Sequence, residues 1–200
     1  MRDFITAALP CDVAGSGDGH GAERQGGRRE KIRPNAIVYT SNTGYTAQYT
    51  ALLGKKTALP VYSLSEAEEK LPAGNPVLYL GWLMASAVKG YQKAAKRYRI
   101  CAVCGVGMGA SGSQLREVRK ANAIPEAVPL FTLQGGFDIT KLRGVYKLMM
   151  TVMVKTAGKG LADKPDRTAE EDVMLDMMLH DGNDVREENL EQVLDWLEKA

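Results

Sequence analysis

Short apolar runs alternate with amphipathic segments along most of the chain. β-Branched and aliphatic residues predict five strands, at 36–40, 59–64, 75–82, 99–107 and 128–136. Apolar residues at helical spacing predict helices after them, over 46–56, 65–71, 88–98, 111–124 and from Asp184 onward. Because alternating strands and helices build parallel sheets covered on both faces, we expect an α/β domain with right-handed crossovers.

Polar residues predict where three of the helices begin. Thr46 is expected to be the N-cap of the first helix. Ser65 and Glu68 fit a capping box at the second helix, and Asp184 with Glu187 fits one at the last.

Two segments interrupt the alternation. Residues 1–34 are rich in glycine and charge and contain little to bury, which predicts a disordered N-terminal extension. The domain is therefore expected over 35–200, with an insertion at about 137–183 after the fifth strand.

Composition is that of an ordinary globular protein of 200 residues, with 44% hydrophobic and 25% charged residues. No apolar stretch reaches the roughly 18 to 20 residues that cross a bilayer, so no spanning segment is expected, although peripheral membrane contact is compatible with the sequence. Cys11, Cys101 and Cys104 are few and odd in number, and no leader pattern is present, which favours a cytoplasmic location. Within a strand, Cys101 and Cys104 are expected to point to opposite faces, which opposes a disulfide or metal site.

Charge is distributed unevenly along the chain. Residues 35–159 contain 16 basic and 6 acidic residues, whereas residues 160–200 contain 4 and 13. The basic residues around the third predicted helix would suit an acidic redox partner; they are Lys89, Lys93, Lys96 and Arg97. No aromatic residues interleave with a basic platform, so no nucleic-acid binding is expected.

The loop after the first predicted strand, TSNTGYT, carries the strongest chemical signal. A loop between a buried strand and a helix start offers unpaired backbone N–H groups to an anion, and its hydroxyls add further donors. It has neither the lysine nor the second glycine of a nucleoside triphosphate loop, so a single terminal phosphate suits it better. The candidate residues are Ser41, Asn42, Thr43, Gly44, Tyr45 and Thr46.

This loop resembles the flavodoxin phosphate loop, T/S-x-T-G-x-T. The resemblance implies a flavodoxin-like three-layer sandwich with a five-stranded parallel sheet in the order 2-1-3-4-5, binding FMN for electron transfer. It places the flavin ring beside two further loops, GWLMAS and GVGMGASG. The residues implied there are Trp82, Leu83, Met84, Gly105, Val106, Gly107 and Met108.

Three alternatives stay open. The segment VYKLMMTVMVKTAGK, residues 145–159, resembles an insertion of the bacterial quinone-dependent, flavodoxin-like protoporphyrinogen oxidases, which implies an enzyme with a small reduced substrate and a quinone acceptor. Gly107, Gly109 and Gly112 form G-x-G-x-x-G before a helix, the fingerprint of an NAD(P)-binding Rossmann dehydrogenase, but at the fourth strand. A binding module with an empty pocket is the third. His20 and His180 supply neither a catalytic triad nor a metal cluster, and no side chain is expected to perform acid or base catalysis.

Overall fold

The computed structural model describes residues 32–136, 148, 151–152, 160, 163–168, 172 and 182–200. Its contacts divide the chain into two units, residues 1–30 and 31–200, and the described residues belong to the second. Residues 1–31, and most of the predicted insertion at 137–183, lie outside the described residues. Arg33 and Pro34, assigned above to the extension, contact the domain: Arg33 donates to the Leu197 carbonyl at 3.0 Å, and Pro34 is buried.

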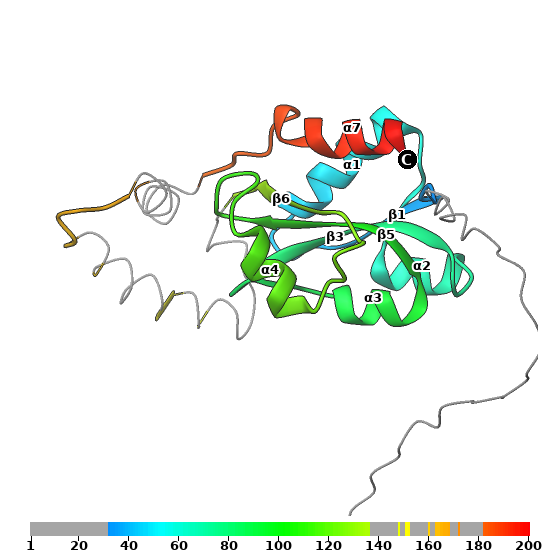
Figure 1. Ribbon diagram of the computed structural model, residues 1–200, viewed down its shortest axis with the longest axis horizontal. Helices are drawn as coiled ribbons and strands as arrows, with labels where there is room; N and C mark the ends of the chain where they lie inside the picture. Colours follow the sequence, from blue (N-terminus) through cyan, green and yellow to red (C-terminus); the bar gives the residue numbers. More distant parts are fainter. Residues whose placement is uncertain are drawn as a thin grey trace, which may run out of the picture. The chain divides into compact units, whose positions relative to one another are not determined.

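A parallel sheet forms the centre of the second unit, as the alternation predicted (Figure 1). Its order is β2-β1-β3-β5-β6. The five strands are β1 (Ala36–Thr40), β2 (Val61–Ser63), β3 (Pro76–Met84), β5 (Arg99–Gly107) and β6 (Leu130–Gln134). The order differs from the expected 2-1-3-4-5 because the chain forms a sixth strand that was not predicted. This strand, β4 (Ala87–Val88), pairs antiparallel with β3 and lies off the path of the other five.

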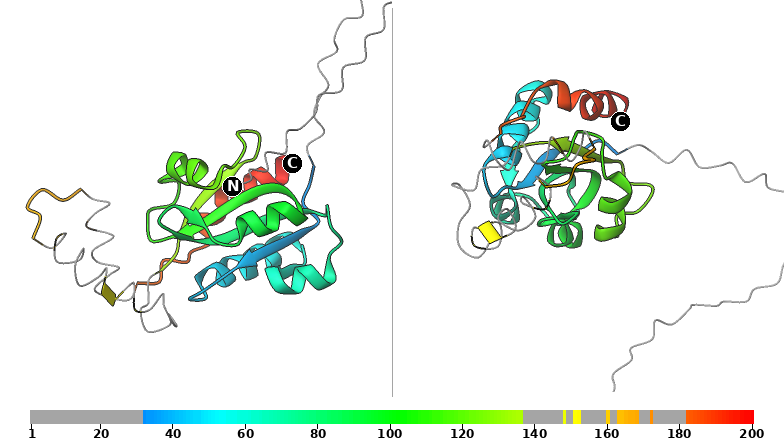
Figure 2. Two further views of the ribbon diagram at one scale, coloured as in Figure 1. Left: turned by 90° about the horizontal axis from the view of Figure 1, so that it is seen from below. Right: turned by 90° about the vertical axis from the view of Figure 1, so that its left-hand side faces the viewer.

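Helices cover both faces of the sheet (Figure 1; Figure 2). One face packs against α1 (Tyr45–Thr57) and α7 (Glu191–Lys199), which follows the 3₁₀ turn η2 (Glu188–Leu190). The other face packs against α2 (Leu64–Lys70), α3 (Tyr91–Arg97) and α4 (Leu115–Asn122). The two faces follow from the alternation of side chains along a strand: in β3, Leu78 and Leu80 join the first core, and Val77 and Tyr79 the second.

The three N-caps predicted from polar residues are all wrong. Gly44, not Thr46, is the N-cap of α1, in the left-handed conformation with φ 96°. The capping box of α2 is formed by Ser63 and Glu66, two residues before the predicted Ser65 and Glu68, because the strand ends at Ser63 and the helix follows it directly. The Ser63 hydroxyl accepts from the Glu66 N–H at 3.3 Å, and the Glu66 carboxylate accepts from the Ser63 N–H at 2.9 Å.

The last helix also begins later than Asp184. Chain residues 182–187 precede η2, and the Asp184 N–H donates to the Gly135 carbonyl at 3.0 Å beyond the end of β6. The apolar face predicted for this helix is confirmed, since Val193 and Leu197 are buried against the sheet.

The outer edge of β6 is covered by the loop before α4. Gly112 N–H donates to the Thr132 carbonyl at 2.9 Å, and Gln134 N–H donates to the Ser111 hydroxyl at 2.9 Å. An edge strand covered in this way offers fewer free backbone groups to another chain.

The two cysteines of β5 lie next to a break in strand register. Val77 pairs with Ile100 and Leu78 with Ala102, so Cys101 is an extra residue in β5. This bulge interrupts the simple alternation on which the prediction of opposite faces relied. Cys101 is half-buried, Cys104 is fully buried, and neither is in a disulfide; burial raises the pKa of the Cys104 thiol.

Candidate anion-binding site

The loop from Ser41 to Gly44 joins β1 to α1 at the carboxyl edge of the sheet. From β1 the chain crosses to β2 on one side, whereas β3 flanks β1 on the other. Loops that leave two neighbouring strands toward opposite sides open a crevice between them, and α/β proteins commonly bind ligands there. The loop singled out in the sequence therefore lies at the topological switch point of the sheet.

The loop leaves the start of α1 open. Gly44 N–H donates to the Ser41 hydroxyl at 3.2 Å, and the first helical hydrogen bond runs from Gln48 N–H to the Gly44 carbonyl at 3.0 Å. The N–H groups of Thr46 and Ala47 precede that bond and so have no acceptor within the helix. The first turn contains no acidic residue and no side-chain cap. An anion placed here would meet the positive end of the helix dipole and no carboxylate from the first turn of α1.

Two observations bear on whether a phosphate fits this loop. A Cβ built on Gly44 meets no atom of the described residues within 4 Å, so the backbone there is open to close approach. Asn42 Nδ2 is buried and has no hydrogen-bond partner among the described residues. Leaving such a donor unsatisfied costs about 1–3 kcal/mol, which an acceptor bound at the loop would offset. The donor set fits a phosphate group.

The segment GWLMAS is not the loop predicted after the third strand. Trp82, Leu83 and Met84 belong to β3, and only Ala85 and Ser86 form the turn to β4. Periodicity alone did not reveal this hairpin, because its turn lacks the Asn-Gly or Gly-rich sequence that usually marks one.

Asn122 at the end of α4 holds the hairpin in place. Its Oδ1 accepts from the Val88 N–H at 2.8 Å, and its Nδ2 donates to the Ser86 carbonyl at 2.8 Å. Asn122 is buried, and both its amide oxygen and its amide nitrogen have hydrogen-bond partners within the chain. Asn122, on the face of the sheet opposite α1, thus positions the segment GWLMAS, which the resemblance placed beside the flavin ring.

A buried tyrosine joins the hairpin to the end of β1. Tyr79 donates its hydroxyl proton to the Lys89 carbonyl at 2.7 Å and shares a hydrogen bond of 2.8 Å with the Thr40 hydroxyl. Burial raises the pKa of Tyr79 to about 12. Gly90 lies so close that a Cβ there would collide with the Tyr79 and Thr40 hydroxyls. Thr40 directly precedes the candidate loop, so this contact fixes the base of that loop.

The remaining predicted residues lie at the end of β5. Gly105, Val106 and Gly107 are strand residues, and Met108 begins the following loop. The Leu83 side chain lies over the glycines, where a Cβ on Gly105 or Gly107 would meet it at 2.9 or 3.1 Å. The Leu83 side chain therefore covers one face of Gly105 and Gly107. This weakens the interpretation of Gly107 as part of a dinucleotide-binding fingerprint.

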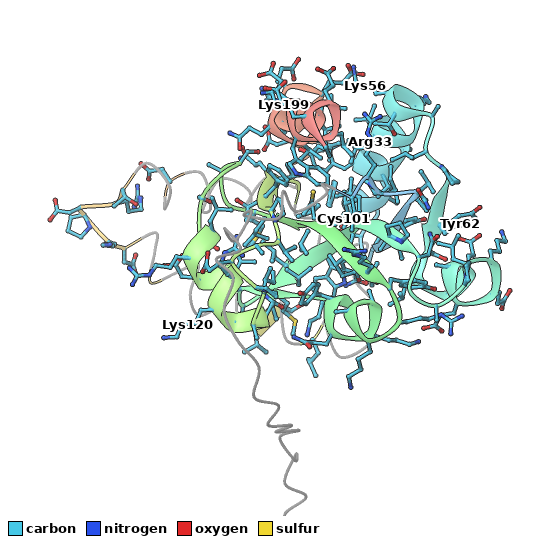
Figure 3. All side chains as sticks on the ribbon, turned by 45° about the vertical axis from the view of Figure 1, so that its right-hand side comes forward. Arg33, Lys56, Tyr62, Cys101, Lys120 and Lys199 are labelled. Carbon is cyan, nitrogen blue, oxygen red and sulfur yellow. The ribbon has the colours of Figure 1, made fainter. Side chains whose placement is uncertain are left out.

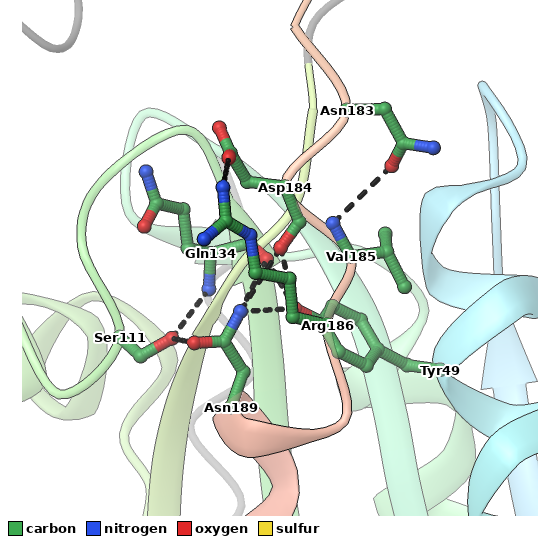
Figure 4. Close-up of polar contacts among 8 residues, drawn as sticks. All are labelled: Tyr49, Ser111, Gln134, Asn183, Asp184, Val185, Arg186 and Asn189. Carbon is green, nitrogen blue, oxygen red and sulfur yellow. Dashed lines mark hydrogen bonds and ion pairs between the residues drawn. The ribbon is translucent and has the colours of Figure 1, made fainter.

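A second polar cluster was missed in the sequence because its members come from distant segments (Figure 4). Asn189 donates to the Tyr49 hydroxyl at 2.7 Å and accepts from the Ser111 hydroxyl at 2.9 Å. The Tyr49 hydroxyl donates to the Gln134 carbonyl. Burial, more than any other cause, raises the pKa of Tyr49. Each of these groups has a partner within the chain, so the cluster ties segments together.

A small cavity of about 100 Å³ lies beside this cluster, at the outer edge of β6 and away from the switch point. Its lining includes Phe131, Thr132, Glu188 and Gln192. It is much smaller than the roughly 300–1,000 Å³ of typical ligand pockets. It does not coincide with the candidate loop.

Comparison with models of protein families, with curated proteins and with solved structures found no match. Within the described part of the chain, no helix is long and apolar enough to cross a bilayer. The same residues contain no group of three or more His, Cys, Asp or Glu side chains that could hold a metal ion.

Proposed function

We propose that the chain binds FMN non-covalently, with a flavodoxin-like arrangement of the site, and acts in electron transfer. The observation that carries this proposal is the open start of α1 at the topological switch point, together with the Asn42 amide nitrogen in the same loop, which has no partner among the described residues. The hydroxyls of Ser41 and Thr43 add neutral donors, which suit a phosphate monoester. Bound FMN would supply a ring that accepts and donates electrons.

Trp82 is the residue best placed to meet an aromatic ligand next to this loop. Thr40 pairs with Gly81 across β1 and β3, so Ser41 follows at the level of Trp82. The Trp82 side chain is half-buried, and a flat indole of this kind stacks on other rings and excludes water. The proposal therefore assigns the phosphate to the loop from Ser41 to Thr46 and the ring system to the neighbourhood of Trp82.

The deciding experiment compares FMN with riboflavin, which lacks the phosphate. A Thr43→Ala/Thr46→Ala variant should bind FMN at least tenfold more weakly, because a hydroxyl bonded to a charged acceptor is worth about 1.5–3 kcal/mol. Its affinity for riboflavin should change little. Flavin fluorescence titration measures both affinities.

A matched control is Thr57→Ala, which removes a hydroxyl from the far end of the same helix, where it bonds the Leu53 carbonyl at 2.7 Å. This variant should keep the affinity of the unaltered protein for FMN. Equal weakening of FMN and riboflavin in the loop variant would refute the phosphate assignment. If the unaltered protein binds neither flavin, the FMN proposal is wrong. The NAD(P)-binding dehydrogenase and the binding module with an empty pocket would then be favoured.

We further propose an acidic redox partner for the face formed by α3 and α4. Lys96, Arg116 and Lys120 are exposed there and have no ion-pair partner among the described residues. Lys120 lies on the side of the molecule opposite Lys56 and Lys199 (Figure 3). Lys93, by contrast, pairs with Glu68 at 2.7 Å, and Arg97 donates to the Glu68 carbonyl at 2.6 Å. We expect the three cations that have no partner within the described ranges to steer the redox partner.

The quinone-dependent oxidase is the second candidate function. Most of residues 145–159 lies outside the described residues, but Leu148 is 68% exposed and Val152 54% exposed. Exposed apolar side chains four residues apart would suit a surface that receives an apolar substrate. Turnover of protoporphyrinogen with a menaquinone analogue above that of free FMN would support the enzyme, and its loss in a Leu148→Ser/Val152→Ser variant that retains FMN would locate the surface. If turnover does not exceed that of free FMN, the oxidase function is wrong and the electron-carrier function is favoured.

A further inference from the structure

The candidate loop contains no lysine, but the fold holds the backbone of one from the hairpin, Lys89, beside the end of β1. Lys89 follows β4, and its backbone carbonyl accepts from Tyr79, which also bonds the Thr40 hydroxyl. The neighbouring Gly90 packs directly against the Thr40 side chain. Because Thr40 immediately precedes Ser41, the backbone of Lys89 is held beside the start of the loop.

The side chain of Lys89 lies on the face of the sheet from which α1 begins. Its N–H donates to the Trp82 carbonyl at 3.0 Å, and its Nζ lies 5.8 Å from the centre of the Trp82 ring. Trp82 continues the alternation of Leu78 and Leu80, whose side chains pack in the core beneath α1. The ammonium group, the indole and the open helix start therefore share one side of the sheet at its carboxyl edge.

This ammonium has no carboxylate partner among the described residues. It is half-buried and held against an aromatic face, which favours a cation without neutralising it. The first turn of α1 has no acidic residue, so the positive end of the helix is not neutralised there either. Two sources of positive potential thus face the same edge, and an anionic ligand would complement both.

We propose that Lys89 is the cationic residue of this site and selects phosphate monoesters over ligands that lack the phosphate. The inference rests on the proposed FMN site and extends it to a residue outside the loop. It also separates the site from a nucleoside triphosphate loop, because the charge comes from the hairpin after β3 and not from the first turn of the helix.

The test is a Lys89→Met variant, which keeps most of the side-chain length but removes the charge. FMN should bind about fivefold to tenfold more weakly, and riboflavin less than twofold more weakly, in flavin fluorescence titrations at low salt. A phosphate monoester loses its second proton near pH 6 and so becomes more negative. The preference of the unaltered protein for FMN over riboflavin should therefore rise between pH 5 and 7.5. That rise should be smaller in Lys89→Met.

Lys96→Met is the matched control, because it removes one positive charge from an exposed position on α3 without approaching the loop. It should leave the FMN-to-riboflavin preference unchanged, and Lys89→Arg should retain that preference within twofold. Equal weakening of both flavins by Lys89→Met, no weakening of either, or loss of the preference in Lys89→Arg would overturn the inference.

The two proposals fail differently. If Thr43→Ala/Thr46→Ala loses the preference for FMN but Lys89→Met does not, the FMN site stands and the role of Lys89 is wrong. If the unaltered protein binds no flavin, both are wrong. Circular dichroism checks that each variant is folded, and should Lys89→Met not fold, Lys89→Gln, which also removes the charge, takes its place with the same expected results.

Discussion

Tyr79 shows how one side chain connects the core to the candidate site. Its ring is fully buried between the sheet and α3, with the Tyr91 ring 6.3 Å away between centroids. Its hydroxyl joins the end of β1 to the Lys89 carbonyl. The burial that raises the pKa of Tyr79 to about 12 disfavours the phenolate in the folded state.

The pH dependence of stability follows from that shift. An unfolded tyrosine ionises near pH 10.0, whereas Tyr79 in the folded protein remains neutral to about pH 12. The stability that this tyrosine contributes is therefore present below pH 10 and is lost as the pH rises through 12. Two pKa units correspond to about 2.7 kcal/mol.

We expect a Tyr79→Phe variant to lose less stability than the unaltered protein between pH 9 and 12, by about 2–3 kcal/mol. At pH 8 it should be about 1–3 kcal/mol less stable, because the Lys89 carbonyl loses its donor. Urea unfolding at several pH values measures both effects. Other tyrosines and cysteines titrate in both proteins, so the difference between the two curves isolates Tyr79, and parallel curves would contradict the assignment.

Gly90 and Gly74 form a pair in which only the surroundings differ. Their φ angles are 81° and 78°, but a Cβ on Gly90 would collide with Tyr79 and Thr40, whereas one on Gly74 meets no described atom within 4 Å. Gly74→Ala should cost about 1 kcal/mol for the backbone conformation alone. Gly90→Ala should cost about 1–3 kcal/mol more. Similar unfolding free energies for the two variants would show that the packing around Gly90 is loose.

Among the elements, the hairpin of β3 and β4 departs most from its sequence pattern. Its turn residues, Ala85 and Ser86, have φ angles of 47° and 62°, a conformation that residues with a Cβ rarely adopt. The sequence predicted a loop here because neither residue favours such a turn. The Asn122 side chain and the strand pairing of Leu83 with Val88 compensate for the unfavourable conformation.

An Ala85→Asn/Ser86→Gly variant should therefore be more stable than the unaltered protein. Asn-Gly is the preferred pair for a two-residue turn with positive φ at both positions, and relief of the conformational cost should add about 1–2 kcal/mol. Thermal and urea unfolding measure the gain. A loss of stability would mean that the side chains of Ala85 and Ser86 make contacts that outweigh the backbone preference.

The ends of the helices explain most of the differences between expected and observed elements. β1 and β5 have the predicted bounds, because a buried strand shows a continuous apolar run. α3 and α4 begin later than predicted because Gly90 and Gln114 take left-handed conformations at their N-caps. Glycine signals such a position in a sequence, but glutamine does not.

For the whole molecule, Asn189 links segments that are far apart in the chain. Through Tyr49, Ser111 and the Gln134 carbonyl, it joins α1, the loop before α4 and the end of β6 to the turn η2 that precedes α7. Each partner would lose a hydrogen bond if the amide were removed, and partly buried groups left unpaired are costly.

Asn189→Ala should lower the free energy of unfolding by about 1–3 kcal/mol. Gln192→Ala, an exposed neighbour on α7, should change it by less than about 0.5 kcal/mol. Urea unfolding compares the two. Equal effects would mean that the Asn189 contacts contribute little beyond those of an ordinary surface residue.

The sequence by itself determined the alternation of strands and helices, the apolar faces of the helices and the hydroxyl-rich loop after β1. These depend on residues close together in the chain, through backbone preference, the period of apolar positions and the chemistry of neighbouring side chains. Only the tertiary structure decided that GWLMAS forms a hairpin, that Leu83 covers the β5 glycines and that Lys89 lies over Trp82 on the side of α1. Those arrangements depend on contacts such as Asn122 with Ser86 and Tyr79 with Thr40, separated by 36 and 39 residues, which no local pattern encodes.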